Sequence, residues 1–367
     1  MTRNDSLLAS ETERCQTSKS LYGDHKARVS ANVGAISDHT RNHAYLGFLR
    51  RCARGKSVLH LGCGIGLWSM VAAKAGATTV TAVDTSTIVH SAQVVAQQNK
   101  LTAVQFLQGK VRDGTVKLPH EKYDIIVCDW IAQFGTNDSL FKEFMFCVIN
   151  HLAPGGITCP NQCTMSVSAI TDYPYYQDTV HFWDNVYGFQ MKPMQPLVTA
   201  EPTTGSIPKN QFVTMPCQLA TKNVTMLAAS ADAAKLLRAS PAAAVVTDDD
   251  AAYAALCGYD APFRLLITRK STVHFLTFFV DCQFTNSSTD AAATGSNFVI
   301  GFQQGGRNEW TEVSAFLPEP LPVVPGDVIE GHVKVQPRGS HTELTLTVKC
   351  RNALIQHEST TQHRFQY

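Results

Sequence analysis

The chain has 367 residues, of which 44% are hydrophobic and 17% charged, and its formal net charge is +1. This length is too great for one ordinary domain, so we expect two. The near-neutral charge gives no electrostatic basis for direct nucleic-acid or membrane binding, and no apolar run reaches the roughly 20 residues of a membrane-spanning helix. The 11 cysteines are an odd, scattered number, typical of reduced thiols in a cytoplasmic protein, and their spacing predicts no metal site.

Residues 1–36 are polar and weakly patterned, which predicts a disordered N-terminal segment without the apolar core of a secretory signal. From residue 37 to residue 158, short apolar runs alternate with helical periodicity. This alternation is typical of a mostly parallel sheet with helices on both faces. We expect strands at 57–61, 79–83, 104–107 and 123–128, and helices near 40–51, 67–75, 87–99 and 138–151.

Three glycines, Gly62, Gly64 and Gly66, follow the first expected strand, and Asp84 ends the second. Glycines at this position let the backbone approach a ligand closely, and a carboxylate at the end of the second strand lies where a ribose diol would bind. The sequence therefore predicts the nucleotide-binding half of a Rossmann-like α/β fold.

Residues 159–367 have the pattern of antiparallel β structure. Alternating β-branched and aromatic residues separated by Gly, Pro and Asn predict a barrel or sandwich, with runs at 164–170, 263–268, 273–284 and 343–349. Residues 190–220 are rich in Pro, Thr and Gln and predict an extended arm, whereas the Ala-rich residues 228–256 predict an inserted helical hairpin. The apolar residues of the arm indicate burial against a partner: Met191, Met194, Leu197, Phe212, Val213 and Met215.

Several separate segments carry a family resemblance. Together with the glycine loop, Ala72–Ala77, Asn99–Leu101 and Trp183–Phe189 resemble the type I protein arginine methyltransferases. The resemblance implies a Rossmann-like S-adenosylmethionine-binding domain, then a β-barrel domain with an inserted dimerisation arm. It also implies that Arg41 grips the methionine carboxylate of the cofactor. In that family two glutamates clamp the substrate guanidinium, and the arm of one subunit packs on its partner's nucleotide domain.

The positions that match the family's reacting groups differ from its pattern. Asp129 and Asp138 stand for the two glutamates, and each is shorter by one methylene. A displacement of about 1 Å can cost about a hundredfold in rate. A Thr-His-Trp loop of the family is replaced by Asn308, Glu309 and Trp310.

The cofactor and lid positions also depart from the family. His60 replaces a strand-end aspartate and Trp68 a smaller aliphatic residue, while Gly23 stands in an aromatic lid motif and Ala35 at a pocket methionine. Low helix propensity in residues 30–34 predicts that this lid does not form. We therefore expect weak or no binding of S-adenosylmethionine by this chain, with the cofactor bound by an active partner.

These departures predict a catalytically inactive paralogue, not itself an enzyme, that resembles the prozyme subunits of trypanosomatids. Such a chain would bind and activate an active arginine methyltransferase in a heterodimer or heterotetramer that methylates arginine-rich proteins. One alternative is an active S-adenosylmethionine-dependent protein arginine N-methyltransferase that uses Asp129 and Asp138 as its clamp. Another is a binding module without an enzyme partner, although the sequence has no basic–aromatic stripe for RNA.

Overall fold

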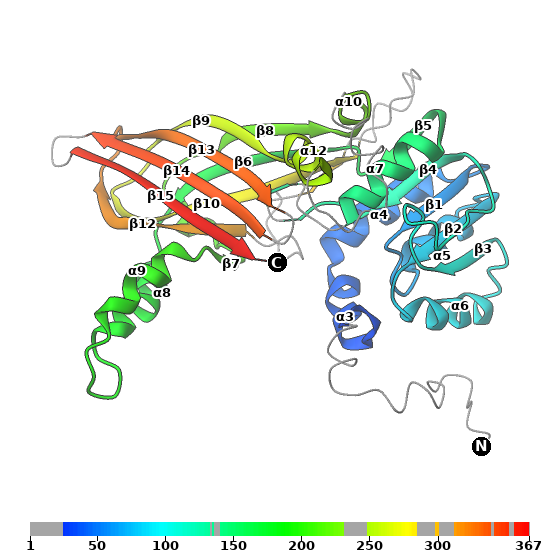
Figure 1. Ribbon diagram of the computed structural model, residues 1–367, viewed down its shortest axis with the longest axis horizontal. Coiled ribbons are helices and arrows are strands. Elements are labelled where there is room, and N and C mark those ends of the chain that lie inside the picture. Colours follow the sequence, from blue (N-terminus) through cyan, green and yellow to red (C-terminus); the bar gives the residue numbers. More distant parts are fainter. Residues whose placement is uncertain are drawn as a thin grey trace. The chain divides into compact units, whose positions relative to one another are not determined.

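The computed structural model describes residues 25–132, 134–135, 140–230, 248–284, 298–300, 312–338, 341–351 and 356–366. The chain divides into two compact units (Figure 1). The first comprises Met1–Trp130, Ser139–Asn161 and Phe284–Phe298, and the second comprises Ile131–Asp138, Gln162–Gln283 and Val299–Tyr367.

The first unit contains a five-stranded parallel sheet in the order β3-β2-β1-β4-β5. Its strands are β1 (Ser57–Leu61), β2 (Thr79–Asp84), β3 (Val104–Gln108), β4 (Tyr123–Cys128) and β5 (Leu152–Cys159). The central strands are buried along almost their whole length, because a parallel sheet covered on both faces needs continuous apolar runs. The four strands expected before residue 130 lie within one residue of those observed, so the prediction of a Rossmann-like sheet is confirmed.

Helices of the first unit follow the expected alternation. They are α3 (Val29–Ser37), α4 (His39–Cys52), α5 (Leu67–Lys74), α6 (Ile88–Gln98) and α7 (Leu140–His151), with a short 3₁₀ turn η2 (His25–Ala27) before them. The carboxylate of Asp38 accepts a hydrogen bond from the backbone N–H of Arg41 at 2.8 Å and so caps the start of α4. The buried residues of α6 are Ile88, Val89, Ala92 and Ala96, whose spacing places them on one face of the helix, and this helix contacts β2 and β3.

The formation of α3 corrects an expectation. Residues 25–36 were expected to be disordered and to leave the lid unformed, yet most of them are helical, while residues 1–24 lie outside the described residues. The side chains of Arg41 and Asn42 donate hydrogen bonds to the carbonyl oxygens of Ala35 and Ile36. These contacts supply partners for helix-end carbonyls and outweigh a weak intrinsic propensity.

The second unit is built from two antiparallel sheets, which confirms the expected barrel-like domain. One has the order β7-β12-β10-β6-β8, with β11 beside β10, and the other has the order β15-β14-β13-β9. Alternate residues of β9 are buried, as expected for a strand with one face on a core. The strands are β6 (Gln162–Ile170), β7 (Thr203–Gly205), β8 (Cys217–Asn223), β9 (Tyr259–Leu266), β10 (Ser271–Phe284), β11 (Phe298–Ile300), β12 (Glu312–Val323), β13 (Val328–Arg338), β14 (His341–Arg351) and β15 (Gln356–Gln366).

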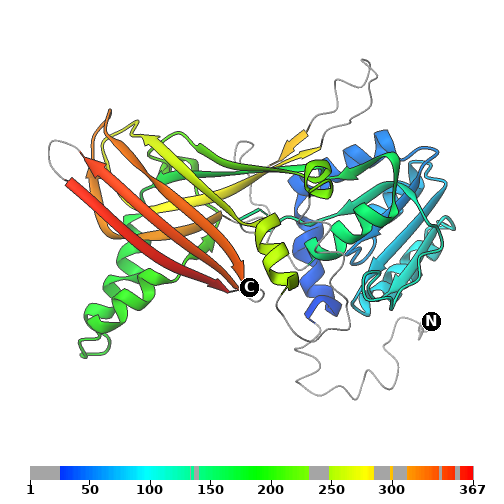
Figure 2. The same cartoon turned by 45° about the horizontal axis from the view of Figure 1, so that its top comes forward.

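A helical hairpin projects from the strands of this unit (green in Figures 1 and 2). It consists of α8 (Tyr173–Thr179), η3 (His181–Asp184), η4 (Lys192–Met194) and α9 (Gln195–Ala200), and η5 (Lys209–Gln211) follows β7. We call residues 173–200 the arm. The arm therefore begins and ends earlier than the predicted 190–220, because the chain after Gln211 returns to the sheets as β8.

Two predicted arm anchors belong to the barrel core instead. Val213 is fully buried, and its N–H donates to the carbonyl oxygen of Ala169 in β6 at 2.9 Å. Phe212 packs against a small cluster that includes Phe275 and Phe316. These two residues therefore lie beyond the arm in this chain, although apolar residues that re-enter a sheet have the same composition as apolar residues on an arm.

The Ala-rich segment is described only in part. α10 (Val224–Ala228) precedes it and α12 (Asp248–Cys257) ends it, while residues 231–247 lie outside the described residues. In α12, Ala252, Tyr253 and Leu256 are buried. The end of the predicted hairpin is thus a helix that contacts β13. In the part of the chain that the structure describes, no helix is long and apolar enough to cross a membrane.

Candidate functional site

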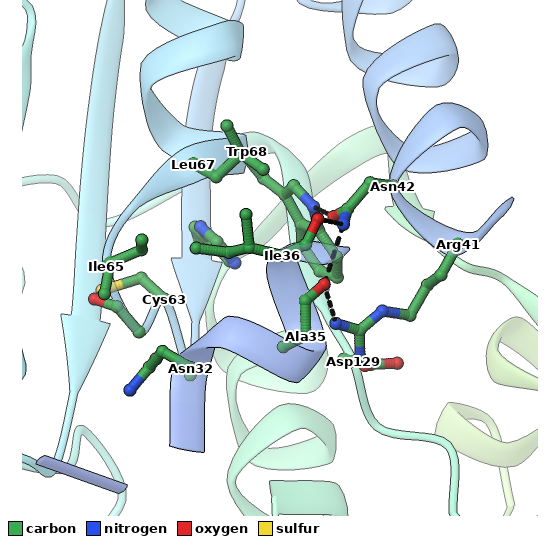
Figure 3. A pocket seen from close by; sticks show the side chains of 13 residues that line it. Asn32, Ala35, Ile36, Arg41, Asn42, Cys63, Ile65, Leu67, Trp68 and Asp129 are labelled. Carbon is green, nitrogen blue, oxygen red and sulfur yellow. Dashed lines mark hydrogen bonds and ion pairs between the residues drawn. The ribbon is translucent and has the colours of Figure 1, made fainter. Parts of the chain in front are cut away.

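A pocket of about 130 Å³ lies in the first unit, at the carboxyl ends of β1 and β4 (Figure 3). This edge is where ligands bind in open α/β sheets. Side chains and backbone from α3, α4, α5 and the loops after the two strands line it: Asn32, Ala35, Ile36, Arg41, Asn42, His60, Gly62, Cys63, Gly64, Ile65, Leu67, Trp68 and Asp129.

The glycine loop has the backbone shape that the sequence predicts. Gly62, Gly64 and Gly66 have φ values of +66°, +52° and +79°, in the left-handed region that glycine adopts without strain. A Cβ atom on Gly66 would lie 2.7 Å from the ring of Phe106, so the helix α5 can start close to the sheet only with glycine here. Gly62 and Gly64 line the pocket.

Asp84 acts as an anchor of this loop. One carboxylate oxygen accepts a hydrogen bond from the N–H of Gly64 at 2.8 Å, and the other accepts from the N–H of Ser86 at 2.9 Å. Asp84 is buried and does not line the pocket. Asp84, which the sequence predicts to bind the ribose, therefore lies beside the glycine loop, and both of its carboxylate oxygens accept hydrogen bonds from backbone amides.

Arg41 and Asp129, which the sequence assigned to cofactor and substrate, are paired with each other. The guanidinium Nη1 of Arg41 lies 2.5 Å from Oδ2 of Asp129, and the hydroxyl of Tyr45 donates to Oδ1 at 3.0 Å. Nη2 of Arg41 donates to the carbonyl oxygen of Ala35 at 2.8 Å, and Figure 3 shows Arg41 extended toward both partners. The two side chains are only 9% and 20% exposed, so water screens the pair weakly.

Trp68 forms the aromatic wall of the pocket. Its ring stacks on Tyr45, with centroids 3.6 Å apart, and on His60, with centroids 5.4 Å apart. Its indole N–H donates to Oδ1 of Asn42 at 2.7 Å. The guanidinium of Arg41 lies 5.6 Å from the ring centroid, within cation–π range.

His60 is a neutral member of this wall. Burial lowers its pKa to about 4, although the nearby carboxylate of Asp84 acts in the opposite direction. Its Nδ1 lies 2.7 Å from the hydroxyl of Ser69. At neutral pH the residue that replaces the family's strand-end aspartate therefore carries no charge.

The sequence did not identify Tyr45 and Asn42 as site residues. Tyr45 lies four positions after Arg41 on α4, and this helical spacing alone could have placed it beside Arg41. Asn42 has no such signal, because its partners belong to α3 and α5.

Other predicted site residues lie apart from the pocket or outside the described residues. Asp138, Asn308, Glu309 and Trp310 are among those not described. Met191 and Met194 are half-buried in the arm, whereas Leu197 is exposed, and so is Met215 beyond the arm. Among the described residues, no group of three His, Cys, Asp or Glu side chains could hold a metal ion.

The sheet order and the glycine-loop pocket define the first unit as a Rossmann-like methyltransferase domain. A family model described as a methyltransferase domain matches residues 58–156. A second, the arginine methyltransferase oligomerization subdomain, matches residues 161–352, which is more than half of the chain. The chain belongs to the protein arginine methyltransferase family.

Relatives match over nearly the whole chain. Protein arginine N-methyltransferase 1 of Chlamydomonas reinhardtii is 28% identical over 330 residues, covering 89% of this chain and 86% of that protein. Its namesake in Schizosaccharomyces pombe is 28% identical over 338 residues, covering 90% and 89%. A chain of the Trypanosoma brucei PRMT1 enzyme-prozyme heterotetrameric complex with AdoHcy is 37% identical with a TM-score of 0.79, covering 92% of this chain and 99% of that chain.

These relatives correct one expectation. The sequence was interpreted as that of a chain that is not itself an enzyme, but curated relatives from several organisms are named protein arginine N-methyltransferase 1 and so point to an enzyme. The shortened acids alone do not decide whether the chain is an enzyme. A change of one methylene alters reach by about 1 Å, and residue type alone does not decide whether the surrounding backbone compensates for it.

S-adenosylmethionine is the methyl donor that the family implies. The pocket in this arrangement does not fit it, because about 130 Å³ is well below the 300–1,000 Å³ of typical ligand pockets. The guanidinium of Arg41 and the oxygens of Asp84 also have protein partners already. The glycine loop has the right backbone form, so the cofactor would need a more open arrangement of α3 and the side chains around it.

Proposed function

We propose that this chain is a subunit of a hetero-oligomeric, S-adenosylmethionine-dependent protein arginine methyltransferase. In this proposal it pairs with a paralogous methyltransferase chain and raises the activity of that chain toward arginine-rich proteins. The observation that carries the proposal is the 37% identity, over 92% of this chain, to a chain of the enzyme-prozyme heterotetrameric complex. The match of residues 161–352 to an oligomerization subdomain supports it.

The arm supplies a surface suited to such a partner. Aromatic side chains near its turn are largely uncovered: Phe182 is 51% exposed, Tyr187 98% and Phe189 72%. Aromatic residues dominate the energetics of protein interfaces, since each can bury about 150–250 Å². Leu197, also in the arm, is 59% exposed and extends this apolar surface.

Hydrogen bonds within the turn of the arm hold its backbone in one conformation. Val186 and Phe189 exchange backbone hydrogen bonds of 2.8 and 2.9 Å, and the side chain of Asn185 accepts from the N–H of Gly188. Tyr187 lies between them with a φ of +50°. A backbone segment that is already fixed loses less conformational entropy when it binds, so this turn is a suitable anchor for the partner subunit.

For the cofactor, we infer that the isolated chain binds S-adenosylmethionine weakly and that the partner holds most of it in the complex. The small pocket volume and the pairing of Arg41 with Asp129 support this inference. The ten cysteines among the described residues are free thiols, and we propose a cytoplasmic location on that basis.

A second candidate function is methyl transfer by this chain's own site, and the names of its relatives favour it. Asp129 lines the pocket, follows β4 and keeps a carboxylate 2.5 Å from Arg41. If the pair separates, that carboxylate becomes available to a substrate guanidinium. Asp138 would be the second acid of the clamp.

One experiment tests both functions. Methyl transfer from labelled S-adenosylmethionine to an arginine-rich peptide is measured for this chain, for a paralogue from the same organism, and for the two co-expressed. Turnover of the co-expressed pair well above the sum of the separate chains supports the activating subunit. Turnover by this chain alone, abolished by Asp129→Ala, supports its own site.

A further inference from the structure

One amide side chain joins three elements around the pocket. Asn42 on α4 accepts a hydrogen bond from the indole N–H of Trp68 on α5 at 2.7 Å. Its Nδ2 donates to the carbonyl oxygens of Ala35 at 2.8 Å and Ile36 at 2.9 Å, in the last turn of α3. Both N–H groups and the oxygen of the Asn42 side chain therefore have hydrogen-bond partners.

Side chains of α4 hold the C-terminal end of α3. Carbonyl groups at the end of a helix lack intrahelical partners, and here Asn42 and Arg41 supply them. α3 itself has no buried residue. Polar contacts from α4, rather than an apolar face, therefore hold this helix at the pocket.

Trp68 is a fixed wall of the pocket. It is 7% exposed, lines the cavity and is fixed by the stack on Tyr45 and by its bond to Asn42. A tryptophan held in this way cannot rotate aside without losing both contacts. A smaller aliphatic side chain at this position would leave open space beside the glycine loop.

We propose that Asn42 and Trp68 form a clasp that keeps α3 closed over the cofactor pocket and determines whether an S-adenosyl ligand can enter. The proposal rests on the proposed function, since it concerns the cofactor site of that function. If only some molecules have an open pocket, the apparent affinity equals the affinity of the open state multiplied by the fraction of molecules that are open. Weakening the clasp raises that fraction and so tightens binding.

The test uses S-adenosylhomocysteine, which carries no transferable methyl group, and the full-length chain without a partner. Its affinity is measured by titration calorimetry for the wild type, Asn42→Ala and Trp68→Leu. Matched controls are Asn99→Ala, at the exposed C-terminal end of α6, and Trp183→Leu, in the arm. Hydrogen exchange of α3 amides is followed in the same samples, and thermal unfolding checks that each variant is folded.

We expect both clasp variants to bind S-adenosylhomocysteine at least tenfold more tightly than the wild type, with faster exchange in α3 and unchanged controls. A tenfold change corresponds to about 1.4 kcal/mol. The proposal is overturned if folded Asn42→Ala binds within twofold of the wild type, or does not bind at all. Asn42→Ala decides the matter alone if Trp68→Leu does not fold.

The two proposals can fail separately. Partner binding and methyl transfer by the co-expressed pair are measured with the wild-type chain and do not depend on the clasp variants. A chain that activates its paralogue but shows no gain in S-adenosylhomocysteine affinity would refute the clasp and leave the proposed function intact.

Discussion

Removing the Arg41–Asp129 pair tests the description of the site most sharply on the isolated chain. Asp129→Ala removes the nearer carboxylate from the guanidinium of Arg41, whose side chain is 9% exposed, while the carboxylate of Asp38 remains 3.8 Å from its Nε. It also removes the acceptor of the Tyr45 hydroxyl. Losing one partner of a buried pair costs about 3–5 kcal/mol. Since the Asp129 side chain is 20% exposed, we expect the lower end, about 3 kcal/mol.

The double variant separates the pair from its surroundings. Arg41→Met keeps an apolar stem and removes the charge, and the double variant Arg41→Met with Asp129→Ala removes both charges of this pair. Because both Arg41→Met variants also take the ion pair at 3.8 Å from Asp38, that loss cancels in the comparison. We expect the double variant to cost less than the two single variants together, by about 2 kcal/mol. Asp178→Ala, on an exposed part of α8, serves as the control and should change stability by less than about 0.5 kcal/mol.

Urea unfolding followed by tryptophan fluorescence measures these differences, because Trp68 and Trp130 are buried in the first unit. If the two single variants are additive within about 0.5 kcal/mol, the two charges are not coupled. The reasoning that the chain's own groups occupy the ligand contacts of Arg41 would then be refuted.

Three further predictions concern other parts of the chain. Burial lowers the pKa of His60 from 6.5 to about 4, so the unfolded state binds more protons between these values, and the free energy of unfolding should fall by roughly 2 kcal/mol from pH 7 to pH 5. If the urea unfolding midpoint of a His60→Gln variant falls with pH as steeply as that of the wild type, His60 is not the cause. Gly66→Ala should destabilise the chain more than Gly55→Ala by at least about 1 kcal/mol. Both glycines have a positive φ, but an added Cβ would meet an aromatic ring within 4 Å at Gly66 and nothing at Gly55. Equal unfolding midpoints of the two variants would disprove this prediction. Tyr187→Ala should weaken binding to a paralogue at least tenfold in calorimetry, whereas Met226→Ala, at another exposed residue, should leave the affinity unchanged. If Tyr187→Ala binds the paralogue as tightly as the wild type, the arm is not part of the interface.

The parallel sheet could be predicted closely because its signals are local. Each strand is one apolar run, and the chain marks their ends with glycine or an acid, as in Gly62 and Asp84. The arm could not be bounded in the same way. Val213 is buried by residues of distant strands such as Ala169, and pairing across such separations leaves no pattern in the local sequence.

The site was predicted in part. The glycine positions and the location of Arg41 followed from spacing and resemblance. The partners of Arg41 and Asp84 did not, since Arg41 meets a carboxylate 88 positions away and Asp84 accepts from the N–H of Gly64 in the loop after β1. α3 was missed for a related reason: intrinsic propensity is a weak guide where side chains of another helix hold the backbone.

Methyl transfer by the co-expressed pair is the most direct test of the central claim, that this chain is a subunit of a hetero-oligomeric protein arginine methyltransferase. The account predicts that a paralogue co-purifies with it and that labelled methyl groups reach an arginine-rich peptide much faster than with either chain alone. Turnover equal to the sum of the separate chains, with no stable complex between them, would contradict the account.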